Sequence, residues 1–136
     1  MSSKLTARDD HSAKNRVSSA PKFNDPDWRT LNLPHDWAGE LPFSERGSGS
    51  HGFKAMSWRF PWSSVGWYRK SFTIPASDLG RRISFEFEGV FRDCIVWFNG
   101  HSPGRGPSGY TSFAYNLSEF ANCGGTNVIM VGAAMF

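Results

Sequence analysis

Apolar and polar residues alternate with a period of two along much of this sequence, and no stretch keeps a helical period for more than a turn or two. A period of two places apolar side chains on one face of a strand and polar side chains on the other. The pattern predicts strands at residues 67–74, 81–90, 94–98, 111–117 and 127–131, with a short extended piece at 31–33. Such a series of short strands separated by turns predicts an all-β fold, namely an antiparallel sandwich or jelly roll.

Details of the pattern place some of these segments within the fold. Residues 94–98 are apolar at every position, which is typical of a central strand covered on both faces. Asn99 and Gly100 follow directly and favour a tight hairpin, because both residue types accept a positive φ. Residues 118–122 predict a single helical turn. Glycine, proline and serine interrupt residues 40–64 and 104–109, which predicts irregular connections there.

The charge distribution divides the chain into a leader and one domain. The 136 residues suffice for a single domain. Residues 1–22 hold five Lys and Arg against two Asp, whereas residues 23–136 hold ten basic and ten acidic side chains. The polar, basic segment 1–22 predicts a disordered leader. Because the domain at 23–136 carries no net charge, the sequence argues against a nucleic-acid-binding surface.

Other classes of protein are also disfavoured by the sequence. The longest apolar stretch, residues 128–136, is far shorter than the roughly 20 residues of a membrane-spanning helix. Residues 1–20 lack the apolar core of a signal peptide, so we expect a cytoplasmic chain. Cys94 and Cys123 form no metal-binding pair with each other or with the histidines, and we expect neither a metal site nor a cofactor. An apolar strand at the very end of the chain would expose its edge, so we expect a chain truncated at its C-terminal end.

Several short motifs occur in an order that resembles one enzyme family. The motifs are Leu-Pro-His-Asp-Trp at 33–37, Val-Gly-Trp-Tyr-Arg-Lys at 65–70, Phe-Glu-Gly-Val at 87–90 leading into Val-Trp-Phe-Asn-Gly at 96–100, Gly-Tyr-Thr-Ser-Phe at 109–113, and Gly-Gly-Thr-Asn-Val-Ile at 124–129. Together they are similar to the N-terminal domain of glycoside hydrolase family 2, of the β-galactosidase type. The resemblance spans roughly residues 23–131 and involves five ordered blocks, which makes it far more specific than one motif.

The resemblance implies a galactose-binding-domain-like jelly roll over residues 23–136, present only in part. In the family this domain precedes an immunoglobulin-like domain and a TIM barrel, and the barrel carries the catalytic glutamates. Neither of these domains is present in the sequence, so the resemblance implies an N-terminal fragment that has no catalytic residue and hydrolyses nothing alone. Its partners would be those domains and a carbohydrate with a terminal β-galactoside. The alternative is a stand-alone module that binds carbohydrate or another domain.

Asp36 and Trp37 are the candidate substrate-binding residues. A carboxylate offers two acceptor oxygens for adjacent sugar hydroxyls, and an indole offers a flat apolar face for a pyranose. The resemblance implies that the position of Asp36 reaches the active site and contacts the non-reducing sugar. The other interpretation makes Asp36 a turn cap and Trp37 a core residue, and for Trp37 we favour the core. His35 is expected to be a structural hydrogen-bonding partner.

Two other groups of residues invite a functional interpretation. Glu86 and Glu88 are two residues apart on a predicted strand, about 6.6 Å between Cα atoms, which is close to the separation of glycosidase carboxylates. Alternating glutamates on a strand are more simply a solvated face, so we reject a catalytic pair. The aromatic residues between Phe53 and Trp62 indicate either a sugar platform or a surface that packs against a neighbouring domain.

Overall fold

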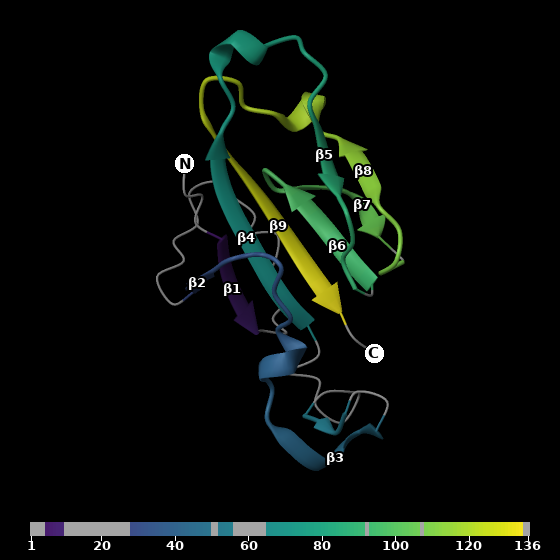
Figure 1. The fold of residues 1–136 in the computed structure, drawn as a ribbon. Coiled ribbons are helices and arrows are strands. Elements are labelled where there is room, and N and C mark those ends of the chain that lie inside the picture. Colours follow the sequence, from purple (N-terminus) through teal and green to yellow (C-terminus); the bar gives the residue numbers. More distant parts are fainter. Residues whose placement is uncertain are drawn as a thin grey trace.

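A computed structural model describes residues 5–9, 28–49, 52–55, 65–91, 93–106 and 108–134, and for residues 5–9 only the backbone. The described residues form an antiparallel six-stranded sheet with the strand order β2-β1-β4-β9-β6-β7 (Figure 1). Its strands are β1 (Leu5–Asp9), β2 (Arg29–Leu31), β4 (Val65–Thr73), β6 (Asp93–Phe98), β7 (His101–Gly106) and β9 (Thr126–Ala134). A second antiparallel sheet pairs β5 (Ser84–Phe87) with β8 (Phe113–Asn116).

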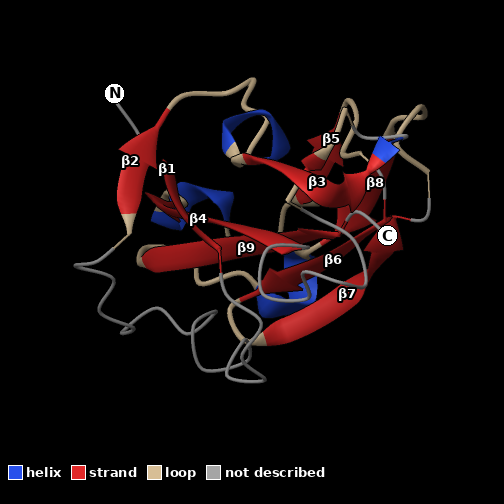
Figure 2. Ribbon diagram, turned by 90° about the horizontal axis from the view of Figure 1, so that it is seen from below, coloured by secondary structure: helices blue, strands red, loops and turns tan. Residues whose placement is uncertain are grey.

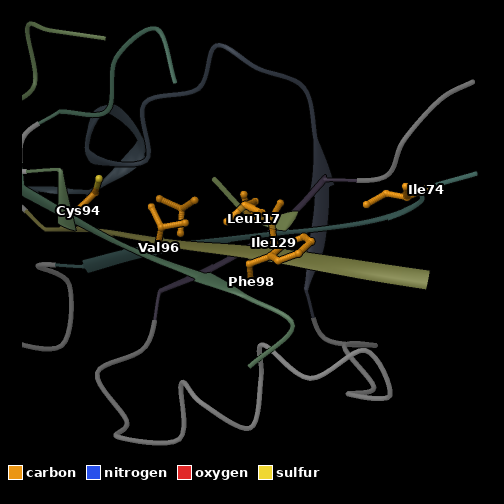
Figure 3. Close-up of a cluster of buried hydrophobic side chains, with 7 residues drawn as sticks. Ile74, Cys94, Val96, Phe98, Leu117 and Ile129 are labelled. Carbon is orange, nitrogen blue, oxygen red and sulfur yellow. The ribbon is translucent and has the colours of Figure 1, made fainter. Parts of the chain in front are cut away.

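The two sheets pack face to face, as Figure 2 shows from below. The main hydrophobic core lies between them, and the residues buried there are Ile74, Cys94, Val96, Phe98, Leu117, Ile129 and Val131 (Figure 3). Aromatic rings of β5 and β8 cover this cluster, with Phe87 and Phe113 stacked at 4.9 Å between ring centroids. The prediction of an all-β antiparallel sandwich is therefore confirmed. Among the described residues only 3₁₀ turns occur as helices, namely η1 (Ala38–Glu40), η4 (Ala76–Asp78) and η5 (Ser118–Phe120), and none could cross a membrane.

The centre of the six-stranded sheet is formed by β9 and β6. β9 hydrogen-bonds to β4 on one side and to β6 on the other, and β6 continues to β7. Residues 127–133 of β9 are buried. The central position predicted for residues 94–98 is confirmed. The prediction that the last apolar strand leaves an edge exposed is wrong, because β9 is covered by a neighbouring strand on each side.

A tight turn connects β6 to β7 at the predicted position. Asn99 and Gly100 both have positive φ, 48° and 84°. Two positive φ angles match the turn type that follows the twist of a two-residue hairpin. The Asn99 side chain also accepts from the Val128 N–H at 2.8 Å and donates to the Phe120 carbonyl at 2.7 Å. The turn is therefore fixed by its own backbone and by contacts with β9 and η5.

Substituting Gly100 tests the turn directly. We expect Gly100→Ala to lower the free energy of unfolding by about 1 kcal/mol, because alanine pays a steric cost at positive φ that glycine avoids. The measurement is urea unfolding of the purified chain. The matched control is Gly89→Ala, whose added Cβ would lie at an ordinary 3.4 Å from the Gly109 carbonyl. Equal stability of the Gly100→Ala variant and the native chain would contradict a positive-φ requirement.

Part of the segment predicted as a disordered leader is a strand. Residues 5–9 form β1, which lies between β2 and β4. Leu5 pairs with Leu31 of β2 and with Lys70 of β4, and Asp9 pairs with Gly66 of β4. The prediction is wrong for these five residues. Strand pairing uses backbone N–H and C=O groups, so a polar and basic composition does not prevent it. The remaining residues of the leader lie outside the described part of the chain.

Two segments predicted as irregular also contain strands. β3 (Phe43–Ser48) lies within residues 40–64, and an isolated bridge joins Phe43 to Lys54. Residues 104–106 belong to β7, where an added Cβ on Gly104 or Gly106 would lie 2.6 Å from the ring of Tyr115 or Phe113. These two glycines therefore lie within a strand, and the absence of a side chain leaves room for the aromatic rings of β8.

Candidate functional site

Asp36 lies in the connection between β2 and η1. Its Oδ1 accepts a hydrogen bond from the Ala38 N–H at 3.0 Å, a local side-chain bond that opens the 3₁₀ turn η1. The residue is exposed, and no described residue contacts Oδ2 through a hydrogen bond or ion pair. One carboxylate oxygen therefore orders the turn, while the other remains available to accept a hydrogen bond from a ligand.

Trp37 anchors this connection to the sandwich. Its side chain is only 5% exposed and packs with Ala38, Leu41 and Tyr68. The indole lies directly on Gly66 of β4, where an added Cβ would be 2.4 Å from Cδ1 of Trp37. This burial favours the core role of Trp37 over a sugar-stacking role, and a direct sugar contact for Trp37 stays a prediction.

His35, on the other side of Asp36, is held by hydrogen bonds. Its Nδ1 lies 2.9 Å from the hydroxyl of Tyr68, a residue of β4, and its Nε2 lies 2.9 Å from Oε1 of Glu40. The guanidinium of Arg29, from β2, donates to Oε2 of Glu40. His35 therefore has the hydrogen-bonding role expected from the sequence, with partners that the sequence did not reveal.

The far end of η1 is held by Lys54. Its ammonium group donates to the carbonyls of Gly39 and Leu41, both at 2.9 Å, and lies 4.1 Å from the centroid of the Phe43 ring. These bonds satisfy carbonyls at the end of a turn. Phe43 and Phe53 are 76% and 56% exposed and line an open pocket of about 440 Å³ together with Ser44 and Glu45. The other aromatic residues of the predicted platform, Trp58, Phe60 and Trp62, lie outside the described residues.

The Asp36 connection lies at one end of the sheet. Gly66, beneath Trp37, pairs with Ala133 near the end of β9, and the neighbouring Val65 pairs with Ala134. In Figure 1, η1 and β3 project below this end of the sandwich. Asp36 is therefore carried on a braced connection at one end of the six-stranded sheet, which is a suitable place to meet a ligand.

The rejected carboxylate pair does not form a site in the structure. Glu86 and Glu88 are both exposed, and β5 ends at Phe87, so Glu88 lies beyond the strand. Neither carboxyl group is desolvated as a glycosidase acid would be. The described residues also contain no cluster of three or more His, Cys, Asp and Glu side chains able to hold a metal ion.

The sequence pointed to Asp36 but not to the residues that brace it. Arg29, Glu40 and Tyr68 join the site through side-chain contacts that no local pattern encodes. Gly66 did carry a signal, because a glycine inside a strand indicates the close approach of another group. From this glycine one could have predicted that a bulky side chain packs on β4, but not that the side chain is that of Trp37.

Comparison with known proteins agrees with this architecture. The chain is 40% identical over 114 residues to the β-galactosidase BoGH2A of Bacteroides ovatus, a match that covers 84% of this chain and 13% of that protein. It is 33% identical over 106 residues to a putative β-glucuronidase of Formosa agariphila, covering 78% of this chain and 10% of the relative. The chain thus spans only about a tenth of the length of these curated relatives. No family model matches the sequence.

Solved structures give the same result. A β-glycosidase from Bacteroides vulgatus superposes with a TM-score of 0.80 at 34% sequence identity, covering 96% of this chain and 16% of that one. A glycosyl hydrolase family 2 member from Bacteroides cellulosilyticus also superposes with a TM-score of 0.80, at 26% identity, covering 98% and 17%. In both, the matching region is a small part of a multidomain enzyme. By sequence and by fold, this chain contains a domain homologous to the N-terminal domain of the family 2 glycoside hydrolases.

Proposed function

We propose that this domain acts as the non-catalytic N-terminal part of a β-galactosidase-type glycosidase and supplies Asp36 to its sugar-binding site. The observation that carries the proposal is the exposed Asp36 carboxylate, with one oxygen engaged by the Ala38 N–H and the other open, on a connection braced by its neighbours. A fixed carboxylate oxygen forms charge-assisted hydrogen bonds with sugar hydroxyls. The bond-breaking carboxylates would lie in another domain.

Two features support a galactoside as the substrate class. The relative with 40% identity is named a β-galactosidase; two relatives named β-glucuronidases are 33% and 31% identical, and a second β-galactosidase is 30% identical. In addition, the two cations beside the Asp36 connection bind groups of the chain itself, since Arg29 binds the Glu40 carboxylate and Lys54 donates to the carbonyls of Gly39 and Leu41. Among these residues the site thus offers Asp36 as an acceptor for sugar hydroxyls, while both cations already bind groups of the chain. This suits a neutral galactoside better than a glucuronide, which carries a carboxylate.

A chimeric enzyme tests the proposal. The matching 114-residue region of the Bacteroides ovatus β-galactosidase is replaced by the corresponding residues of this chain, and kcat/KM is measured on 4-nitrophenyl β-D-galactopyranoside. We expect turnover by the chimera and none by the 136-residue chain alone. Asp36→Ala should lower kcat/KM by about 10- to 100-fold, because a hydrogen bond to a charged group is worth roughly 1.5–3 kcal/mol.

The control for this variant is Glu86→Ala, which removes an exposed carboxylate from β5 and should leave kcat/KM unchanged. An Asp36→Ala chimera with kcat/KM within twofold of the parent chimera would refute the sugar contact. Submillimolar binding of methyl β-D-galactoside by the chain alone, measured by calorimetry, would instead favour a stand-alone carbohydrate-binding module.

A further inference from the structure

A chain of polar side chains runs from β2 across the Asp36 connection to β4. Arg29 donates to Oε2 of Glu40, Oε1 of Glu40 lies 2.9 Å from Nε2 of His35, and Nδ1 of His35 lies 2.9 Å from the Tyr68 hydroxyl. Three of these residues are near one another in the sequence, but Tyr68 is 33 positions beyond His35. The chain therefore ties the local turn to the central sheet.

Glu40 is the residue that closes this arrangement around Asp36. It is the last residue of η1, its backbone N–H donates to the Trp37 carbonyl at 3.3 Å, and its side chain returns to His35. Residues 35–40 thus form a ring closed by one side-chain bond. Asp36 is one of the residues of this closed segment, between His35 and the buried Trp37.

Two groups face Nε2 of His35, namely Oε1 of Glu40 at 2.9 Å and the Arg29 guanidinium at 3.3 Å, and the shorter contact is the one to the carboxylate. A carboxylate only accepts hydrogen bonds, so the proton on His35 belongs on Nε2, where it is donated to Glu40. Nδ1 forms a hydrogen bond with the Tyr68 hydroxyl, a group that can donate or accept. The proton on Nε2 is assigned from its carboxylate partner, since hydrogen positions follow from the partners. The hydrogen bonds from Arg29 and then His35 hold the pKa of Glu40 below its ordinary value, so Glu40 stays an acceptor at neutral pH.

We propose that Glu40 is a positioning residue that fixes Asp36 for its sugar contact by locking His35 to β4. The inference rests on the proposed function, because it assigns the position of the same carboxylate. The salt bridge itself is exposed, with 53% and 48% of the Arg29 and Glu40 side chains accessible. Exposed ion pairs contribute little to stability. The role of Glu40 is therefore geometric, and its removal should disturb Asp36 far more than the fold.

Glu40→Ala and Glu40→Gln separate this role from general stabilisation. In the chimera we expect Glu40→Ala to raise KM for the nitrophenyl galactoside by about tenfold with kcat within twofold, because small misplacements of a positioning group cost large factors. Glu40→Gln keeps a carbonyl oxygen that can accept a hydrogen bond from Nε2 of His35, so its KM should lie close to that of the parent chimera. Glu86→Gln is the matched control on β5, and it should change neither constant.

A spectroscopic readout on the 136-residue chain is independent of chimera activity. We expect ¹⁵N chemical shifts of His35 to report a protonated Nε2 in the native chain and in Glu40→Gln, and a mixture of forms with and without that proton in Glu40→Ala. Unchanged His35 shifts together with a KM within twofold in Glu40→Ala would overturn the inference. If instead Asp36→Ala also leaves kcat/KM unchanged, the sugar contact itself fails. If Asp36→Ala is impaired and Glu40→Ala is not, only the positioning role fails.

Discussion

Replacing Gly66 with alanine is expected to release Trp37 from β4 and to lower kcat/KM of the chimera by about 10- to 100-fold, as much as removal of the Asp36 carboxylate itself. The added Cβ would lie 2.4 Å from Cδ1 and 2.6 Å from Cγ of Trp37, closer than side-chain atoms approach one another. The indole is buried at 5% exposure and packs with Ala38, Leu41 and Tyr68, so a displaced ring must disturb these contacts. Because Asp36 directly precedes Trp37, displacement of the ring moves the carboxylate as well.

The same substitution should also cost stability. Overpacking a buried contact typically costs about 1–3 kcal/mol, and we expect the upper part of that range because both groups are anchored. Urea unfolding of the purified variant measures this cost. Gly89→Ala is the matched control, since among the described residues its Cβ would meet only the Gly109 carbonyl, at 3.4 Å. A Gly66→Ala variant with native stability and native kcat/KM would show that Trp37 does not depend on this glycine.

Replacing Asn127 with alanine is expected to lower the free energy of unfolding by about 4 kcal/mol, a large share of the 5–15 kcal/mol typical of a domain. Asn127 is fully buried in β9. Its Oδ1 accepts from Nδ2 of Asn99 and from the Asn122 N–H, both at 2.8 Å, and its Nδ2 donates to the carbonyls of Asn122 and Gly125 at 2.9 and 3.1 Å. These four bonds use the full capacity of an amide side chain.

Alanine at position 127 would remove all four of these hydrogen bonds together with the buried amide, and at about 1 kcal/mol for each bond the loss is about 4 kcal/mol. Urea unfolding tests this prediction. The control is Asn116→Ala, because Asn116 is exposed and its Oδ1 accepts only from Ser118, at 3.1 Å from the N–H and 2.7 Å from the hydroxyl. We expect a loss of about 1 kcal/mol or less for this control. Equal losses in the two variants would contradict a special role for the buried amide.

The strands that could be predicted from the sequence are those whose apolar side chains are buried in the core. β4 and β6 carry regular apolar patterns because one or both faces are buried, and Asn99-Gly100 specifies its own turn. β1 and β7 could not be found in this way. β1 is polar and owes its conformation to backbone pairing, and the glycines of β7 make room for the rings of β8. In both cases the strand is defined by its neighbour rather than by its own side chains.

The candidate site shows the same division. Asp36 and Trp37 could be predicted as site residues from the sequence, because both belong to the motif at residues 33–37. The bracing residues were not, because each acts through a partner at a distance. Glu40 resembles any exposed glutamate until His35 and Arg29 are placed beside it.

The most direct test of the central claim is a comparison of monodeoxy galactosides in the chimera. The ratio of kcat/KM between the parent chimera and Asp36→Ala is measured for nitrophenyl β-D-galactopyranoside and for its derivatives that each lack one hydroxyl. If Asp36 binds a sugar hydroxyl, the ratio falls from about 10- to 100-fold to near one for the derivative that lacks that hydroxyl, because the two deletions remove the same interaction. A ratio that stays the same for every derivative would contradict direct contact between Asp36 and the sugar.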